Sequence, residues 1–177
     1  MSEILGTLFK YLLALLAITA VVVVLYEALA SNKVSTAVAE VSTLESNLTQ
    51  YYSAADGATF DSTATDIINA GLAPTEMINS SNIYSPWGVV NFSAPGTTAG
   101  GGGIEVALTG VPAAACSKLV MALVPTMDHI LVGSNTVTSQ DASLVEEVAS
   151  DCNQATNTVG FVFSANVGTP SSSSSSK

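Results

Sequence analysis

Apolar residues fill the start of the chain almost without interruption. The stretch Leu12–Leu25 reads LLALLAITAVVVVL and contains no charged residue, Gly or Pro. Together with the apolar residues on either side it covers about 20 residues, the length of a helix that crosses the hydrocarbon core of a bilayer. We expect the following side chains to lie in a membrane or in the core of a fibre: Leu12, Leu13, Leu16, Val21, Val24 and Leu25.

Three interpretations of this segment stay open. It is a signal peptide cut after the small residues Ala28-Leu29-Ala30, a permanent single-span anchor, or a helix that leaves the membrane and becomes the core of a fibre. Glu3 offsets Lys10, so the segment lacks the basic start of a signal peptide. The third interpretation is therefore favoured.

From residue 31 onward the apolar residues no longer surround the helix but recur along one of its faces. Apolar residues recur at alternating spacings of three and four, which places them on one face of a helix. No Pro or Gly occurs between Tyr26 and Gly57. The sequence therefore predicts a helix over 1–54, hydrophobic over 1–30 and amphipathic over 31–54. This face is expected to pack on the region that follows rather than in a coiled coil, and it consists of Val34, Ala37, Val41, Leu44, Leu48 and Tyr51.

The pattern after the long helix predicts a small mixed domain over 55–168. We expect short helices over 62–70, after Pro112 and over 141–152, the last capped by Asp141, because Pro and Asp favour helix starts. Strands are expected near Val89–Phe92 and over Ile104–Leu108, Ile130–Val137 and Val159–Phe163. Hairpin-type loops between strands predict an antiparallel sheet, hence an α+β fold. The residues 169–177 are nearly all Ser and predict a disordered tail.

Charge narrows the classes of function. The chain of 177 residues has a net charge of −10, contains no Arg, and has only 10% charged residues. Because phosphate backbones attract Lys and Arg, this balance excludes nucleic-acid binding by charge. Ordinary globular proteins carry about a quarter charged residues. The low charge therefore favours a surface that faces a partner, a membrane or the cell exterior.

Two cysteines, Cys116 and Cys152, are present. Their spacing fits neither a zinc site, which needs further Cys or His, nor a redox pair two residues apart. The apolar segment and the composition place the domain outside the cytoplasm, where disulfides persist. This favours a structural disulfide, worth about 3–4 kcal/mol, over two buried free thiols.

No pattern of catalytic residues occurs in the sequence. His129 is the single His, and its neighbour Asp128 does not make a charge relay by sequence adjacency alone. The run Gly100–Gly103 is followed by Ile-Glu rather than by the Lys-Ser/Thr of a phosphate-binding loop. We therefore expect no enzyme activity, no cofactor and no metal.

The order of these features resembles that of type IV pilins, most closely the type IVb class, which includes toxin-coregulated pilin and the thin-pilus pilins of conjugative plasmids. Four segments carry the resemblance. They are Leu48-Thr-Gln-Tyr-Tyr52 at the end of the helix, the turn Ser85-Pro-Trp-Gly88, the run Leu108–Val120 around Cys116, and Cys152 followed by the strand Val159–Phe163.

The resemblance implies the pilin fold, a long helix packed on a small antiparallel sheet with a disulfide between Cys116 and Cys152. It implies a structural subunit, the major pilin of a type IVb pilus, that assembles into an extracellular helical filament for adhesion or conjugation. The implied partners are other copies of the chain, the inner membrane before assembly and the pilus assembly machinery. N-terminal methylation is implied as well.

One position departs from the family pattern. The family has Glu as the fifth residue of the mature chain, where its carboxylate is thought to pair with the N-terminal amine of a neighbouring subunit; here the fifth residue is Leu5. Met1 is expected to be the first or near-first residue of the mature chain, with any leader already removed, and Glu3 or a Glu3–Lys10 contact would take over the pairing. A cut after Gly6, which would leave Thr7 first, is disfavoured because the six residues before it lack the basic character of a pilin leader. The departure keeps two alternatives open: a minor pilin or pseudopilin of type II secretion, and a single-span periplasmic binding protein that does not polymerise.

Overall fold

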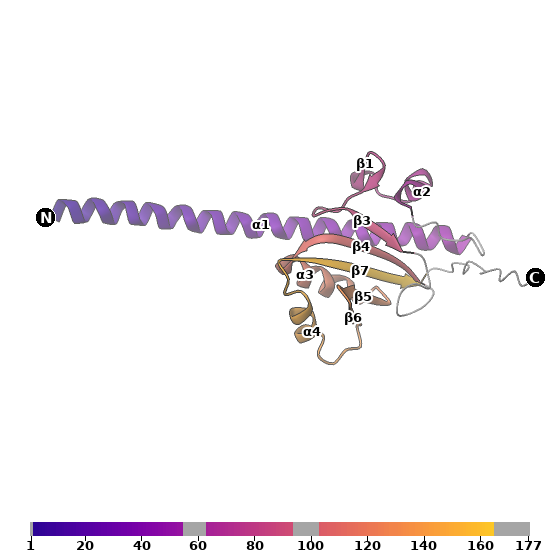
Figure 1. The fold of residues 1–177 in the computed structure, drawn as a ribbon. Coiled ribbons are helices and arrows are strands. Elements are labelled where there is room, and N and C mark those ends of the chain that lie inside the picture. The colour runs from indigo at the N-terminus through magenta and orange to yellow at the C-terminus, as the bar shows by residue number, and fades with distance from the viewer. Residues whose placement is uncertain (1, 55–62, 94–102, 165–177) are drawn as a thin grey trace, which may run out of the picture.

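The computed structural model describes residues 2–54, 63–93 and 103–164, and within the first helix it describes the side chains of 9–22 and 31–54. The expected tail 169–177, most of the glycine run at 100–103, and Met1 lie outside the described residues. The fold consists of a long helix, α1, that projects from a compact head (Figure 1).

Helix α1 runs from Ser2 to Ala54 without interruption. At about 1.5 Å per residue it is about 80 Å long. Its C-terminal half lies along the head, and its N-terminal half extends away from it (Figure 1). Since residues 7–54 contain no Gly or Pro, nothing in the sequence interrupts the hydrogen-bond ladder at the border between the two halves.

An antiparallel sheet forms the centre of the head. Its strands, in spatial order, are β3 (Val90–Ser93), β4 (Gly103–Pro112), β7 (Thr156–Ser164), β5 (His129–Val132) and β6 (Asn135–Val137). The strand β7, last in the described chain, pairs with β4 through Val106 opposite Phe161 and with β5 through Ile130 opposite Phe161. Strands distant in sequence are thus joined through β7.

The core lies between α1 and the sheet. In β7 all residues from Val159 to Phe163 are buried, and in β4 Ile104 and Val106–Leu108 are buried, so burial does not alternate along these central strands. The side chains of these strands that pack in the core are Ile104, Val106, Leu108, Val159, Phe161 and Phe163. They belong to one cluster with the buried face of α1, and its largest members include Phe161, Leu44, Leu48, Ile104, Leu108 and Leu119.

Smaller elements lie on opposite sides of α1. On one side are α2 (Ala64–Asn69), the 3₁₀ helix η1 (Thr75–Met77) and the hairpin of β1 (Ile78–Asn79) and β2 (Asn82–Ile83). On the other side are α3 (Ala113–Leu123) and α4 (Leu144–Asp151), as Figure 1 shows. The expected fold class, α+β with a long N-terminal helix, an antiparallel sheet and one disulfide, is confirmed.

Two local predictions are wrong. The expected strand Ile130–Val137 is a hairpin of β5 and β6, because Gly133 turns the chain with a positive φ of 62°. Asp141 does not cap α4, whose N-cap is Ser143. The carboxylate of Asp141 instead accepts hydrogen bonds from the backbone N–H of Thr138 at 2.6 Å and from its hydroxyl at 3.0 Å, so it closes the turn before the helix.

Candidate functional site

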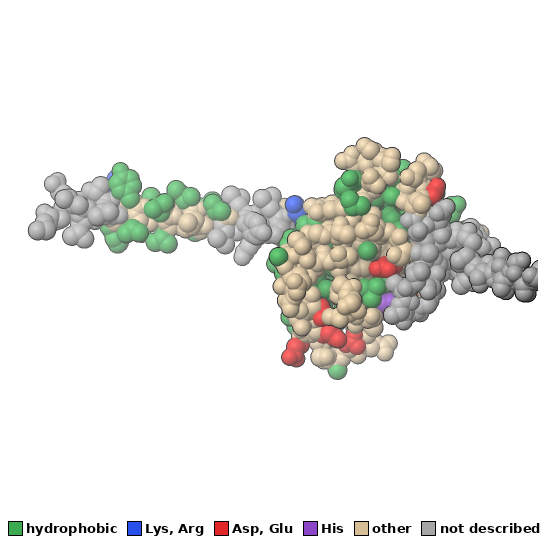
Figure 2. All heavy atoms as spheres, viewed as in Figure 1, with side chains coloured by type: hydrophobic (Ala, Val, Ile, Leu, Met, Phe, Trp, Pro, Cys, Tyr) green, Lys and Arg blue, Asp and Glu red, His purple; other side chains and the backbone are tan. Residues whose placement is uncertain are grey.

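The projecting half of α1 exposes apolar side chains on all sides. Leu12, Leu13, Leu16 and Val21 are 57%, 53%, 64% and 58% exposed. In Figure 2 they form a stretch dominated by hydrophobic side chains outside the head. An exposed apolar surface of this size marks an interaction site. The side chains of Val24 and Leu25, which belong to the same prediction, lie outside the described residues.

Within the part of the chain that the structure describes, no helix is long and apolar enough to cross a membrane.

The predicted charges at the start of the helix are described in part. Lys10 is exposed, whereas Met1 and the side chain of Glu3 lie outside the described residues. The expected contact between Glu3 and Lys10 therefore stays a prediction.

The C-terminal half of α1 is anchored to the head by one face. Val34, Val41, Leu44 and Leu48 are buried. The prediction for Tyr51 is wrong: it is 45% exposed, and Tyr52 is buried in its place. Spacings that alternate strictly between three and four imply 3.5 residues per turn, but an α-helix has about 3.6. Tyr52 lies about five whole turns beyond Val34, so it returns to the buried face.

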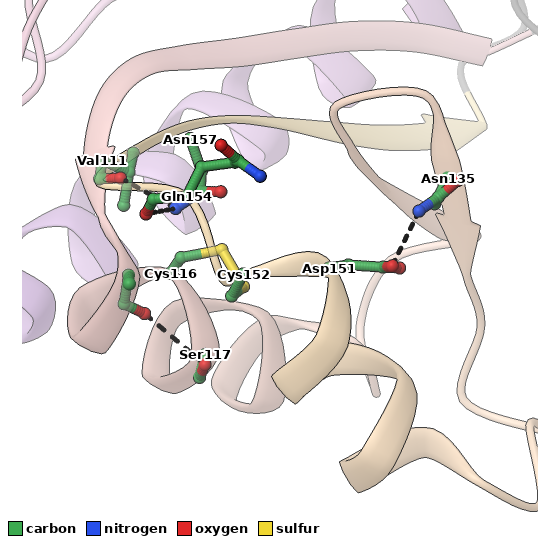
Figure 3. The surroundings of a disulfide bond; sticks show 9 residues. Val111, Cys116, Ser117, Asn135, Asp151, Cys152, Gln154 and Asn157 are labelled. Carbon is green, nitrogen blue, oxygen red and sulfur yellow. Dashed lines mark hydrogen bonds between the residues drawn. A yellow bond between two sulfur atoms is a disulfide. The ribbon is translucent and has the colours of Figure 1, made fainter.

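Cys116 and Cys152 form a disulfide with a Cα–Cα distance of 5.7 Å. It joins α3 to the residue that ends α4 (Figure 3). Nearby, the buried Asn157 side chain donates hydrogen bonds to the backbone oxygens of Val111 at 3.3 Å and Gln154 at 3.1 Å. The bridge and Asn157 together tie both ends of the α3–α4 region to β4 and β7.

The turn Ser85–Gly88 docks on an irregularity of β4. The hydroxyl of Ser85 accepts hydrogen bonds from the N–H groups of Trp87 and Gly88, both at 3.3 Å. The register of β4 shifts between Leu108 and Val111, where Gly110 has a φ of 76°. A Cβ on Gly88 would lie 2.9 Å from the backbone oxygen of Thr109. The motif therefore lets two backbones approach closely.

Two glutamates of α1 lie at the border between the helix and the head, where the ionised form of each carboxyl is disfavoured. Burial, and after it the charge of Glu76, raises the pKa of Glu40. Burial, and after it the charge of Asp128, raises the pKa of Glu45. Oε2 of Glu40 is inaccessible and has no hydrogen-bond partner in the structure. The sequence pattern showed these residues only as polar positions beside the apolar stripe, so their neighbours could not be foreseen.

These residues offer surfaces for binding. Among the described residues, no three His, Cys, Asp or Glu side chains gather in a way that could hold a metal ion. The features that stand out are an exposed apolar helix, a helix–head junction packed through one buried face, and a covalently closed α3–α4 region.

Comparison with protein families matches the PilS N-terminal family over residues 31–164. Among solved structures, the type IV b pilin from Salmonella typhi superposes with a TM-score of 0.60 at 22% identity, covering 74% of this chain and 99% of that one. TcpA, a type IV pilin from the Vibrio cholerae El Tor biotype, gives 0.57 at 15% identity, covering 75% and 99%. No curated protein sequence matches. At these identities the likeness shows the fold.

Proposed function

This chain belongs to the PilS N-terminal family and has the fold of type IV pilins, and from this premise we propose that it is the major structural subunit of a type IVb pilus. The observation that carries the proposal is the projecting half of α1, with apolar side chains more than half exposed on all sides. Such a helix needs surroundings that are apolar all round, and a bundle of identical helices supplies them.

In this proposal the apolar half of α1 is held in the inner membrane before assembly. The pilus assembly machinery then moves it from lipid into the helix bundle of the filament. One apolar environment replaces another, so the transfer itself costs little free energy. Contacts between different surfaces of identical copies do not close, and they generate an open helical filament outside the cell that serves adhesion or conjugation.

Charges near the start of α1 would set the register between copies. A charge in an apolar bundle is costly unless it is paired. We propose Met1, Glu3 and Lys10 as the groups that take over this pairing, since Leu5 stands in the place of the family's usual Glu if Met1 is the first residue of the mature chain.

The departure at Leu5 leaves open a second candidate, a minor pilin or a pseudopilin of type II secretion. Both candidates are structural, like the pilins that the fold resembles, and neither is an enzyme. The third candidate, a single-span periplasmic binding protein, predicts that the chain never polymerises.

Sheared surface material tests the proposal. Cells that make the chain are sheared, the supernatant is imaged by electron microscopy, and the intact mass of its main protein is measured. We expect filaments of this chain, with the mass of Met1–Lys177 less two hydrogens for the disulfide and plus one methyl group. A chain that stays in the membrane fraction without filaments would contradict the major-pilin role, and a mass that begins at Ser31 would identify the N-terminal segment as a signal peptide.

A further inference from the structure

A groove between α1 and η1 holds two carboxylates and no cation among its lining residues. Its volume is about 470 Å³, and small side chains of α1 line it together with Glu40, Pro74 and Glu76. The charge of Glu76 adds to the burial that raises the pKa of Glu40, so the two carboxylates repel each other. The groove therefore lacks a positive group that would pair with both.

Cations are scarce in this chain, and those described are exposed. Lys10, Lys33 and Lys118 all point to solvent. Within the described residues, Lys118 forms no ion pair. It is an exposed residue of α3, and Figure 1 draws α3 on the opposite side of α1 from β1, the strand that directly follows η1. The helix α3, which carries Lys118, and the segment η1–β1, which borders the groove, thus lie on opposite sides of α1.

This placement suits contact between copies in a filament. An open helical assembly needs two different, complementary surfaces on each subunit. Lys33 lies close to two full turns before Glu40, hence on the same side of α1 as the groove. It is therefore not on the side of the molecule that a second copy would turn toward the groove. A parallel copy that approaches the groove presents its opposite edge, and that edge carries α3 and Lys118.

We propose that Lys118 of a second copy enters the groove between α1 and η1 and places its ammonium between Glu40 and Glu76. The inference rests on the proposed function, since it names a contact between pilus subunits. The aliphatic stem of lysine can lie along the small side chains Thr36, Ala39 and Thr43, as such stems do on apolar surface. Its three N–H donors suit the two carboxylates that line the groove.

The two edges also match in apolar character. On the groove side, Tyr84 and Val89 are each 37% exposed, and the N–H of Tyr84 bonds to the oxygen of Met77 at the end of η1. On the other side, Met121 of α3 is 40% exposed, one turn after Lys118, and Val145 of α4 is 69% exposed. Contact between the edges would cover these side chains around the ion pair. Excluding water there strengthens the attraction between the two charges.

A charge exchange in the full chain tests the contact. Lys118→Glu or Glu76→Lys alone places like charges together, and we expect each to lower the yield of sheared filaments about tenfold or more. The double variant Lys118→Glu/Glu76→Lys restores opposite charges, and its yield should return to near that of the wild type. Thermal unfolding of each purified subunit verifies that the head still folds.

Glu146→Lys provides the matched control, because Glu146, like Glu76, is an exposed glutamate in the first turn of a helix. We expect it to assemble normally and not to rescue Lys118→Glu. Rescue by Glu146→Lys as complete as that by Glu76→Lys would mean that net charge, and not this contact, governs assembly, and would overturn the inference.

Zero-length cross-linking identifies the partner directly. A carbodiimide forms an amide bond between a lysine amine and a carboxylate in contact, and takes up the water that is lost. In filaments of mixed ¹⁵N-labelled and unlabelled copies we expect mixed-isotope cross-links from Lys118 to Glu76 or Glu40. Filaments that cross-link through Lys33 instead, or that form normally from Lys118→Glu, would overturn this inference alone. No filaments from the wild-type chain would overturn the proposed function as well.

Discussion

At the scale of residues, the border between α1 and the head combines apolar burial with unfavourable charge. Glu40 and Glu45 sit on different sides of the buried stripe, and each lies near a second carboxylate, Glu76 or Asp128. A carboxyl whose pKa is raised in the folded state stabilises the fold while it is protonated, and that contribution is lost as the pH rises through the raised pKa. These two carboxyls should therefore contribute more to the stability of the isolated subunit in mild acid than at neutral pH.

Glu40→Gln removes one of these charges without changing the shape of the side chain. We expect a higher melting temperature at pH 7 and little difference near pH 4, where the wild-type carboxyl is largely protonated. Since Glu40 is half-exposed, solvent screens the effect to under about 1 kcal/mol. Thermal unfolding at both pH values measures it, and an equal gain at both would contradict the electrostatic origin. The same variant should assemble less well, because the groove loses a carboxylate.

The backbone of Thr109 lies so close to Gly88 that it leaves no room for a side chain there. The Cβ position of Gly88 lies 2.9 Å from the backbone oxygen of Thr109 and 3.1 Å from the Thr109 hydroxyl oxygen. Gly88→Ala must displace backbone, and we expect it to cost about 1–3 kcal/mol in urea unfolding.

Gly160→Ala is the control for this prediction. Its added Cβ would lie 2.6 Å from Oε1 of Glu105, the end of a flexible side chain that can move away. A loss for Gly160→Ala as large as that for Gly88→Ala would show that the backbone contact at Thr109 is not the cause.

At the scale of elements, the α3–α4 region depends on its covalent closure. The disulfide joins residues 36 positions apart, and its two cysteines are 0% and 2% exposed. In the chain-entropy description, closing a loop of this length stabilises the fold by about 3–4 kcal/mol. The region also holds the proposed contact residue Lys118. The disulfide therefore helps to fix the position of the helix that carries this contact.

Replacing both cysteines by Ala should lower the free energy of unfolding by about 3–4 kcal/mol. Urea denaturation of the oxidised protein measures the loss. Added reductant should destabilise the wild type by a similar amount and leave the double variant unchanged. A variant as stable as the oxidised wild type would contradict the structural role of the bridge.

The sequence predicted elements well where a single period dominates. The stripe of α1 follows directly from the period of a helix, and the unbroken apolar run Val159–Phe163 marked the buried strand β7. It failed where one residue overrides a pattern: Gly133 breaks an apolar run into a hairpin, and Asp141 bonds to Thr138 instead of capping α4. The site was predictable as far as its apolar helix and cysteines. The approach of Glu76 to Glu40 depends on how η1 folds over α1, which no local pattern encodes.

At the scale of the whole molecule, the described part divides into a head that holds all of the described core and a projecting helix that holds none of it. Among the side chains that the structure describes, the buried one nearest the start of the chain is Val34. The two parts share α1, so movement of the projecting half is transmitted to the head through one continuous helix.

A fragment of residues 31–164 should therefore keep the fold of the head. We expect a cooperative thermal transition close to that of the full chain, an intact disulfide, and a monomer in sedimentation without detergent. The fragment should form no filaments, since it lacks the apolar half of α1. An unfolded fragment would contradict the division into two parts, and filaments from it would contradict the role of residues 1–30 in assembly.

The position of β7 has a consequence for synthesis. It lies between β4 and β5, yet it is the last described strand of the chain. While the ribosome is still translating the residues before Thr156, the nascent chain has the pairs β3–β4 and β5–β6 but no strand to join them. The head is completed only when translation reaches its final strand, so a prematurely terminated chain is left with two separate hairpins and is exposed to the proteases that remove unfinished proteins.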